Sequence, residues 1–126
     1  MTLRTPMARV RGLGASRTGT DHFWWQRVTA VANVPLTIAG IVIVISLLGR
    51  NHAATAQILG SPLIAILLLL FILSVCGHMR IGMQVIIEDY VHDEKSKIAL
   101  IMLNVFYVFA VGLASIYAIL KLSFGV

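Results

Sequence analysis

Residues 61–91, SPLIAILLLLFILSVCGHMRIGMQVIIEDYV, decide the fold class of this chain. The apolar run within them, 62–87, exceeds the roughly 20 residues that a helix needs to cross a hydrocarbon core about 30 Å thick. His78 lies inside this run, and the stretch closes with Asp89 and Tyr90. Ligating side chains are rare within membrane-spanning helices and usually serve a function there. A neutral imidazole in such a place typically binds a metal or haem iron, or relays protons.

Two further apolar runs, 28–48 and 98–120, flank this one along the chain. Hydrophobic residues make up 59% of the sequence and charged residues 12%, whereas a soluble domain carries roughly a quarter charged residues. The sequence therefore predicts an all-α membrane protein with three transmembrane helices, running up, down and up. We expect a single domain over residues 1–126, in which residues 1–22 form a cytoplasmic tail.

The formal net charge of +5 is unevenly distributed along the chain. Before the first apolar run the basic residues outnumber the single acid, and the connection between the second and third runs carries Lys95 and Lys97. The positive-inside rule then places the N-terminus in the cytoplasm. Topology and contact with anionic lipid account for this charge. Nucleic-acid binding is not expected, because no recognition module accompanies the basic residues.

Two other residues of the second run, Cys76 and Arg80, could also carry chemistry. Cys76 is the only cysteine, so an intrachain disulfide is excluded, and the residue is interpreted as a small apolar packing group. Arg80 lies about 200° around the helix from His78, so it faces the other side. Its charge must reach the interface or meet a partner, and the sequence assigns it no role.

His78, Gly82, Val85 and Asp89 share one face of the predicted helix. Gly82, one turn beyond the histidine, leaves room where a flat macrocycle would lie. Each residue also has a simpler interpretation: His78 as a hydrogen-bond donor to a neighbouring carbonyl, Gly82 as a packing glycine, Asp89 as a solvated acid. Tyr90 would then be an ordinary interfacial tyrosine.

Two motifs together resemble a known family. The motif His78-x-x-x-Gly82-Met83, followed by Asp89-Tyr90-Val91, is similar to the hydrophobic membrane-anchor subunits of succinate dehydrogenase, the smaller of the two anchor chains. The segment Phe23-x-x-x-Arg27-x-Thr29-Ala30, at the entry to the first apolar run, matches as well. The resemblance covers residues 20–126.

The resemblance implies that His78 is one axial ligand of haem b, with the other supplied by the partner anchor subunit. It also implies that Tyr90 donates a hydrogen bond to ubiquinone, with Asp89 orienting the site or passing protons. Arg27 is expected to meet a haem propionate, although a contact with lipid is the alternative. Expected partners are a second cytochrome b anchor, an iron–sulfur subunit and a flavoprotein.

The expected function is therefore that of a membrane anchor of succinate:ubiquinone oxidoreductase, respiratory complex II. The isolated chain is not expected to be an enzyme, because it contains no flavin motif and no cysteine set for clusters. One alternative is the anchor of a quinol:fumarate reductase, and another is a structural or assembly membrane protein without a cofactor. The lack of an Arg/Ser-rich presequence favours a bacterial cytoplasmic (inner) membrane.

Overall fold

The computed structural model describes residues 5–12 and 19–125, and these contain helices and no strand. The helices are α1 (Pro6–Val10), α2 (Gly19–Leu47), α3 (His52–Leu59), α4 (Pro62–Tyr90) and α5 (Glu94–Phe124). By length and hydropathy α2, α4 and α5 can each cross a membrane, which confirms the prediction of an all-α protein with three candidate spans.

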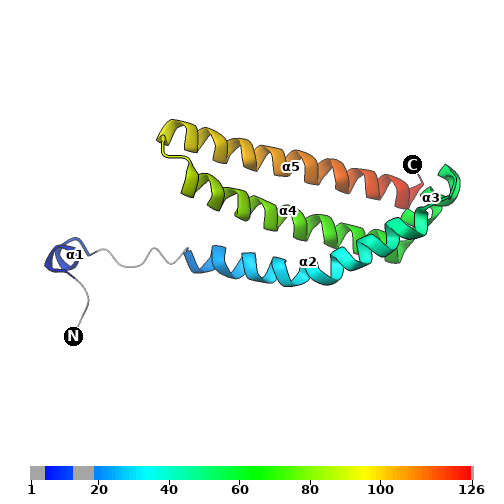
Figure 1. Ribbon diagram of the computed structural model, residues 1–126, viewed down its shortest axis with the longest axis horizontal. Helices are drawn as coiled ribbons and strands as arrows, with labels where there is room; N and C mark the ends of the chain where they lie inside the picture. Colours follow the sequence, from blue (N-terminus) through cyan, green and yellow to red (C-terminus); the bar gives the residue numbers. More distant parts are fainter. Residues whose placement is uncertain (1–4, 13–18, 126) are drawn as a thin grey trace.

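α4 lies in the middle of the molecule, with α2 on one side and α5 on the other (Figure 1). α4 packs along both neighbours, whereas α2 and α5 barely touch each other. The chain runs up, down and up through these helices. As a result, the start of α2, the end of α4 and the start of α5 lie at one end, and α3 and the C-terminus lie at the other (Figure 1).

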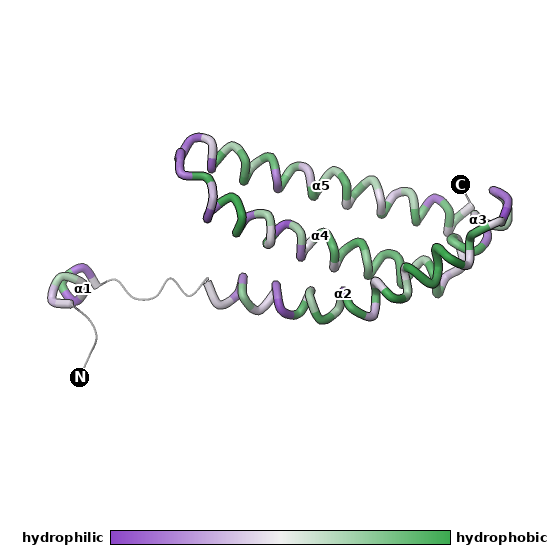
Figure 2. Tube along the Cα trace, in the orientation of Figure 1, coloured by the Kyte–Doolittle hydropathy of each residue, from purple (hydrophilic) through white to green (hydrophobic). Residues whose placement is uncertain are grey.

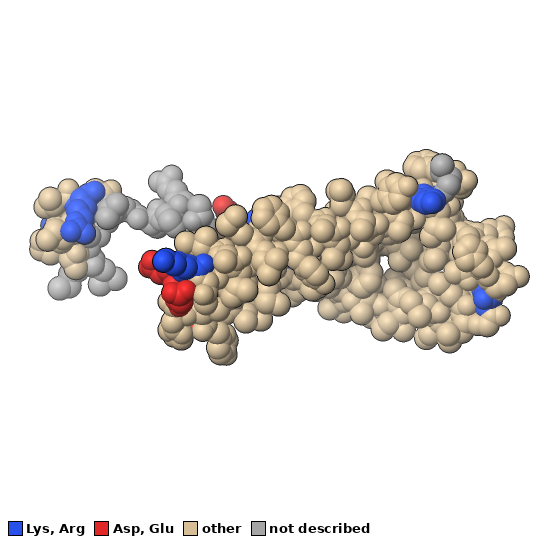
Figure 3. All heavy atoms as spheres, turned by 90° about the horizontal axis from the view of Figure 1, so that it is seen from above, with Lys and Arg blue, Asp and Glu red and all other residues tan. Residues whose placement is uncertain are grey.

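Most apolar side chains of the three long helices face outward. The buried apolar residues of the described chain are only Ile43, Ala65, Ile87 and Ile119. Figure 2 shows long hydrophobic stretches along α2, α4 and α5. On the face drawn in Figure 3, the charged side chains gather toward the two ends and leave an uncharged band between them. An exposed apolar surface this extensive is unusual for a soluble monomer, and it fits a protein solvated by lipid and by other subunits.

Small residues allow α4 to approach both neighbours. A Cβ added to Gly40 would lie 3.4 Å from the Phe71 ring, and one added to Gly112 would lie 3.5 Å from Cys76 Sγ. Such close approaches maximise van der Waals contact where no hydrophobic effect drives helices together. Gly40 and Gly112 therefore both lie where helices meet.

The helix ends follow local capping rules. Asn51 Oδ1 accepts the Ala54 N–H at 2.9 Å and begins α3, and Pro62 occupies the first turn of α4. Asp93 begins α5 by accepting hydrogen bonds from the Ser96 N–H at 2.9 Å and the Ser96 hydroxyl at 2.7 Å. Gly125 ends that helix in the left-handed region, with φ of 68°.

The helices extend beyond the predicted apolar runs. α2 begins at Gly19, so residues 19–22 of the expected tail are helical, and it continues through Pro35. The sequence predicts a short outer loop over residues 51–61, but this segment contains α3, which the Asn51 cap begins. Runs of apolar residues mark only the length of helix that lipid covers, because a backbone helix continues through polar residues until a cap or turn ends it.

Candidate functional site

His78 lies on α4 where that helix packs against α2, and its side chain is half-buried. The ring atom Nδ1 lies 3.1 Å from the hydroxyl oxygen of Thr29 on α2. The Thr29 hydroxyl also lies 2.8 Å from the carbonyl oxygen of Trp25 and 3.2 Å from that of Gln26. One turn earlier on α4, the Ser74 hydroxyl donates to the Thr29 carbonyl at 3.3 Å. Residues of α2 and α4 are thus joined by polar contacts at the level of the imidazole.

Gly82 lies one helical turn beyond His78, and a Cβ added there would meet nothing within 4 Å. Gly77 differs, because its Cβ would contact the Thr29 methyl group at 3.8 Å. The packing of this chain therefore gives no reason for a glycine at position 82, although glycine costs about 1 kcal/mol relative to alanine inside a helix. The space beside Gly82 is open to a group from outside the chain.

Asp89 and Tyr90 form the last turn of α4 and are both exposed. Tyr90 is 78% exposed. By helical geometry Asp89 lies about 20° from His78 around α4, whereas Tyr90 lies about 120° away and about 18 Å further along the axis. By this geometry Asp89 shares the face of His78 and Tyr90 does not.

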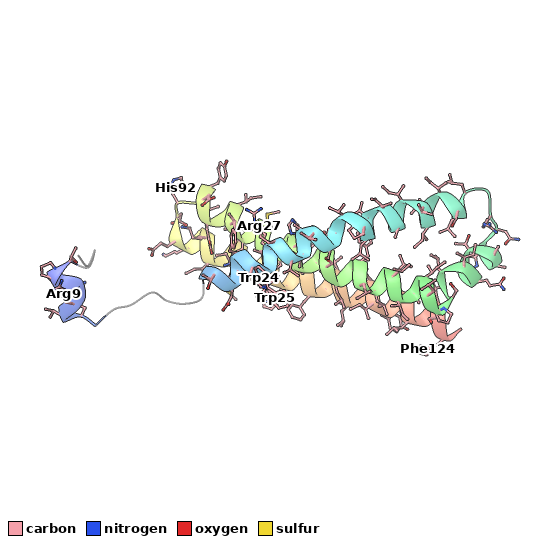
Figure 4. The ribbon with its side chains drawn as sticks, turned by 90° about the horizontal axis from the view of Figure 1, so that it is seen from below. Arg9, Trp24, Trp25, Arg27, His92 and Phe124 are labelled. Atoms are coloured by element: carbon pink, nitrogen blue, oxygen red, sulfur yellow. The ribbon has the colours of Figure 1, made fainter. Side chains whose placement is uncertain are left out.

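Arg27 lies on the opposite side of α2 from Thr29, about 200° around the helix. Its guanidinium stacks over the Phe23 ring, 5.0 Å from the centroid. Figure 4 shows Arg27, Trp24 and Trp25 near the end of the molecule that also carries His92, far from Phe124. Within this chain Arg27 and His78 are therefore not brought together.

A groove of about 420 Å³ with both polar and apolar side chains in its lining lies between α2 and α4, on the other side of their contact from the His78–Gly82 face. Sequence reasoning missed this groove, although it found Arg80 on the side away from His78. The spacing of residues 77, 80, 81 and 84 could have indicated it, because these positions lie on one face of a helix. The groove is lined by Asp21, His22, Trp25, Thr29, Gly77, Arg80, Ile81 and Gln84.

Amide side chains in apolar helices commonly form hydrogen bonds to a neighbouring helix, and the sequence predicts this for Asn33, Gln84 and Asn104. Asn104 of α5 is buried and donates from Nδ2 to the Arg80 carbonyl of α4 at 3.0 Å, as expected. Gln84 instead donates to Glu88 on its own helix at 2.8 Å, so that prediction was wrong. Asn33 Oδ1 is buried and has no hydrogen-bond partner among the described residues.

No group of three or more His, Cys, Asp or Glu side chains gathers to hold a metal ion in residues 5–12 and 19–125. The chemistry available on the His78 face is therefore that of one imidazole, an open space beside it and an acidic residue at the helix end. Such a face can supply one ligand to a larger group but cannot enclose that group alone.

The chain matches a family model described as "Succinate dehydrogenase/Fumarate reductase transmembrane subunit" over residues 1–112. This match covers most of the chain, so the protein belongs to that family of membrane subunits, and the resemblance found in its motifs is confirmed.

Curated relatives agree with the family. The chain is 31% identical to the succinate dehydrogenase hydrophobic membrane anchor subunit of Paracoccus denitrificans, over 96% of this chain and 93% of the relative. It is 31% identical to the membrane anchor subunit of Reclinomonas americana, over 70% and 76%. It is 29% identical to the hydrophobic membrane anchor subunit of Rickettsia bellii, over 79% of each chain. No solved structure matches the chain.

The apolar helices and the bacterial relatives make this a multi-pass protein of the bacterial inner membrane.

Proposed function

We propose that this chain is a membrane-anchor subunit of succinate:ubiquinone oxidoreductase. The names of the three relatives support succinate as the electron donor of the complex. In this role the chain joins a second anchor subunit and holds an iron–sulfur subunit and a flavoprotein at the membrane. The broad outward-facing apolar surface of α2, α4 and α5 is suited to a second membrane subunit and to lipid.

We further propose that His78 is an axial ligand of haem b, shared with the second anchor. The observation that carries this proposal is the open space beside Gly82, one turn from a half-buried imidazole. The residues present fit a haem, since imidazole nitrogen is an ordinary haem ligand and a missing side chain one turn away admits a flat ring. When bound, the haem would supply one-electron transfer.

The role of Arg27 in this proposal depends on a second subunit. Its guanidinium points away from Thr29 around α2, so it would meet a propionate only where the partner anchor brings that group to the outer side of α2. A guanidinium makes strong charge-assisted hydrogen bonds with a carboxylate. Arg27 therefore contributes to holding the cofactor at the surface between the two anchors.

Tyr90 and Asp89 are proposed to form part of the ubiquinone site. The phenol of Tyr90 is largely exposed at the end of α4, so its hydroxyl is available to a ligand held between subunits. Quinone reduction places negative charge on the carbonyl oxygens, and a fixed hydroxyl donor stabilises such charge. Asp89, its neighbour, would orient the site or transfer protons.

The end that carries the start of α2 and the turn between α4 and α5 is proposed to face the cytoplasm and dock the soluble subunits. Lys95 and Lys97 lie at this end, at the start of α5, and the sequence before α2 is rich in basic residues. The positive-inside rule supports that orientation.

The haem assignment is tested by replacing His78 with leucine in the purified complex. We expect the reduced b-type absorption band to be lost or strongly weakened in His78→Leu. His52→Leu, which changes an exposed histidine at the other end, is the matched control and should keep the band. Unchanged haem content in His78→Leu would show that the imidazole is not a ligand and would favour an anchor in which it only packs.

A second variant tests the space beside Gly82. Gly82→Leu should lower haem content several-fold while leaving the anchor assembled, because a side chain there meets nothing in this chain. Gly77→Leu should instead disturb the α2–α4 contact through Thr29. Full haem content in assembled Gly82→Leu would remove the main support for the cofactor position.

A further inference from the structure

The Thr29 hydroxyl has one proton and three close neighbours. It lies 2.8 Å from the Trp25 carbonyl, 3.2 Å from the Gln26 carbonyl and 3.1 Å from His78 Nδ1. Carbonyl oxygens only accept hydrogen bonds, and 2.8 Å is the usual length of an O–H···O bond. A threonine inside a helix commonly donates to the carbonyl four residues earlier. The Thr29 proton is therefore directed to Trp25, and its oxygen faces His78 as an acceptor.

A hydroxyl oxygen that acts as acceptor requires a proton on the ring nitrogen it faces. In a neutral imidazole one nitrogen carries the proton and the other carries the lone pair. With the proton on Nδ1, the lone pair is on Nε2, and Nε2 has no hydrogen-bond partner among the described residues. Thr29 thus selects the tautomer whose free nitrogen can bind a metal.

We infer that Thr29 is a positioning residue for His78, which fixes its tautomer and the rotation of its ring so that Nε2 is presented to iron. This inference rests on the proposed function, because it matters only if His78 is the haem ligand. Ligating histidines usually donate their second N–H to a protein acceptor, which raises the basicity of the ligand. The Ser74 hydroxyl, bonded to the Thr29 carbonyl at 3.3 Å, ties the backbone of Thr29 to the helix that carries His78.

The electronic effect has a definite sign. An acceptor at Nδ1 increases the electron density at Nε2, and a more electron-rich ligand stabilises ferric over ferrous iron. Loss of the Thr29 oxygen should therefore raise the midpoint potential of the haem and weaken its attachment. Losing the hydrogen-bond partner of a metal ligand typically lowers metal affinity about 10–100-fold.

The test compares Thr29→Val, Thr29→Ser and Thr37→Val in the purified complex. Valine keeps the shape of threonine and removes the acceptor, whereas serine keeps the acceptor. Thr37→Val removes a hydroxyl from the same helix two turns away and is the matched control. We measure the haem midpoint potential, the haem retained on dilution and the binding of carbon monoxide to the reduced haem.

In Thr29→Val the haem midpoint potential should rise, and haem should be lost about 10–100-fold more readily. The reduced haem of this variant should also bind carbon monoxide. Thr29→Ser and Thr37→Val should resemble the wild type. If Thr29→Val does not assemble, Thr29→Cys, a weaker acceptor, should give a smaller rise in potential. Wild-type behaviour in the Val or Cys variant overturns this inference if His78→Leu still loses its haem. If His78→Leu keeps its haem, the proposed function itself fails.

Discussion

At the scale of single residues, two glycines on α4 differ in what lies beside them. Gly77 faces α2, where an added Cβ would make an ordinary contact with the Thr29 methyl group at 3.8 Å. Gly82 has no such neighbour. The same residue type, five positions apart, thus lies against a neighbouring helix in one case and beside open space in the other.

Tyr90 gives the prediction that belongs to this scale. In Tyr90→Phe we expect succinate:quinone reductase activity to fall about tenfold, the effect of losing about 1.4 kcal/mol of stabilisation from one hydroxyl donor. Succinate oxidation measured with a soluble dye should be unchanged, because it bypasses the quinone site.

Tyr107→Phe, which removes an exposed phenol from the middle of α5, is the control and should leave both activities intact. A Tyr90→Phe complex with full quinone reductase activity would contradict the assignment of this tyrosine to the quinone site.

At the scale of elements, the joint between α3 and α4 depends on Gly60. A Cβ there would lie 2.5 Å from the Leu122 carbonyl oxygen and 3.0 Å from that of Ala56. The Gly60 backbone in turn caps α3 by donating to the Ala56 carbonyl at 2.9 Å. The end of α5 therefore fits against this turn only where no side chain intervenes.

Gly60→Ala should lower the free energy of unfolding by about 1–3 kcal/mol, the usual effect of an added group in a closely packed site. Thermal unfolding of the detergent-solubilised complex measures this. Gly19→Ala, whose added Cβ meets nothing within 4 Å, is the matched control and should unfold at the wild-type temperature. Equal unfolding temperatures for both variants would disprove the close contact.

The start of α5 gives a pH-dependent prediction. The hydrogen bonds from the Ser96 hydroxyl and N–H lower the pKa of Asp93 below its ordinary value of 3.8. A lowered pKa in the folded state means that this cap stabilises the protein above pH 3.8 and stops doing so as the pH falls through the folded pKa.

Thermal unfolding of wild type and Asp93→Asn should therefore differ at neutral pH and converge in acid. Asparagine keeps a capping oxygen but does not titrate, so it isolates the effect of charge. A difference between the two proteins that stays constant from pH 7 to pH 3 would show that the carboxylate charge is not responsible.

At the scale of the whole molecule, the central position of α4 divides the chain into two unlike sides. His78, Gly82 and Asp89 share one side of α4, whereas Arg80 and Gln84 lie on the other side and line the groove between α2 and α4. Because α2 and α5 hardly touch each other, the two are held together through α4.

The orientation of the molecule can be tested with single cysteines in a Cys76→Ala background. Gln57→Cys, on α3, should react with a membrane-impermeant maleimide in intact cells. Lys95→Cys, at the start of α5, should react only after the membrane is opened. Both positions are exposed, so access depends on the side of the membrane. The reverse pattern would invert the topology proposed from the basic residues.

Much of the site followed from spacing alone, because a regular helix fixes which residues share a face. His78, Gly82 and Asp89 were placed together in this way, and Arg80 on the other side. The spacing along one helix does not reveal contacts between helices, so the hydrogen bond between His78 and Thr29 and the groove lined by His22 and Arg80 were missed. The α3 helix was missed because its eight residues carry no long apolar run.

The sequence by itself determined that three apolar segments become helices that cross a membrane, since an isolated backbone in lipid must satisfy its hydrogen bonds internally. It also determined that one imidazole lies within such a segment. Only the tertiary structure decided which helix lies in the middle, which hydroxyl faces that imidazole and where a missing side chain leaves open space. Those features depend on the approach of side chains from segments about 50 residues apart, and the periodicity of one helix contains no information about its neighbour.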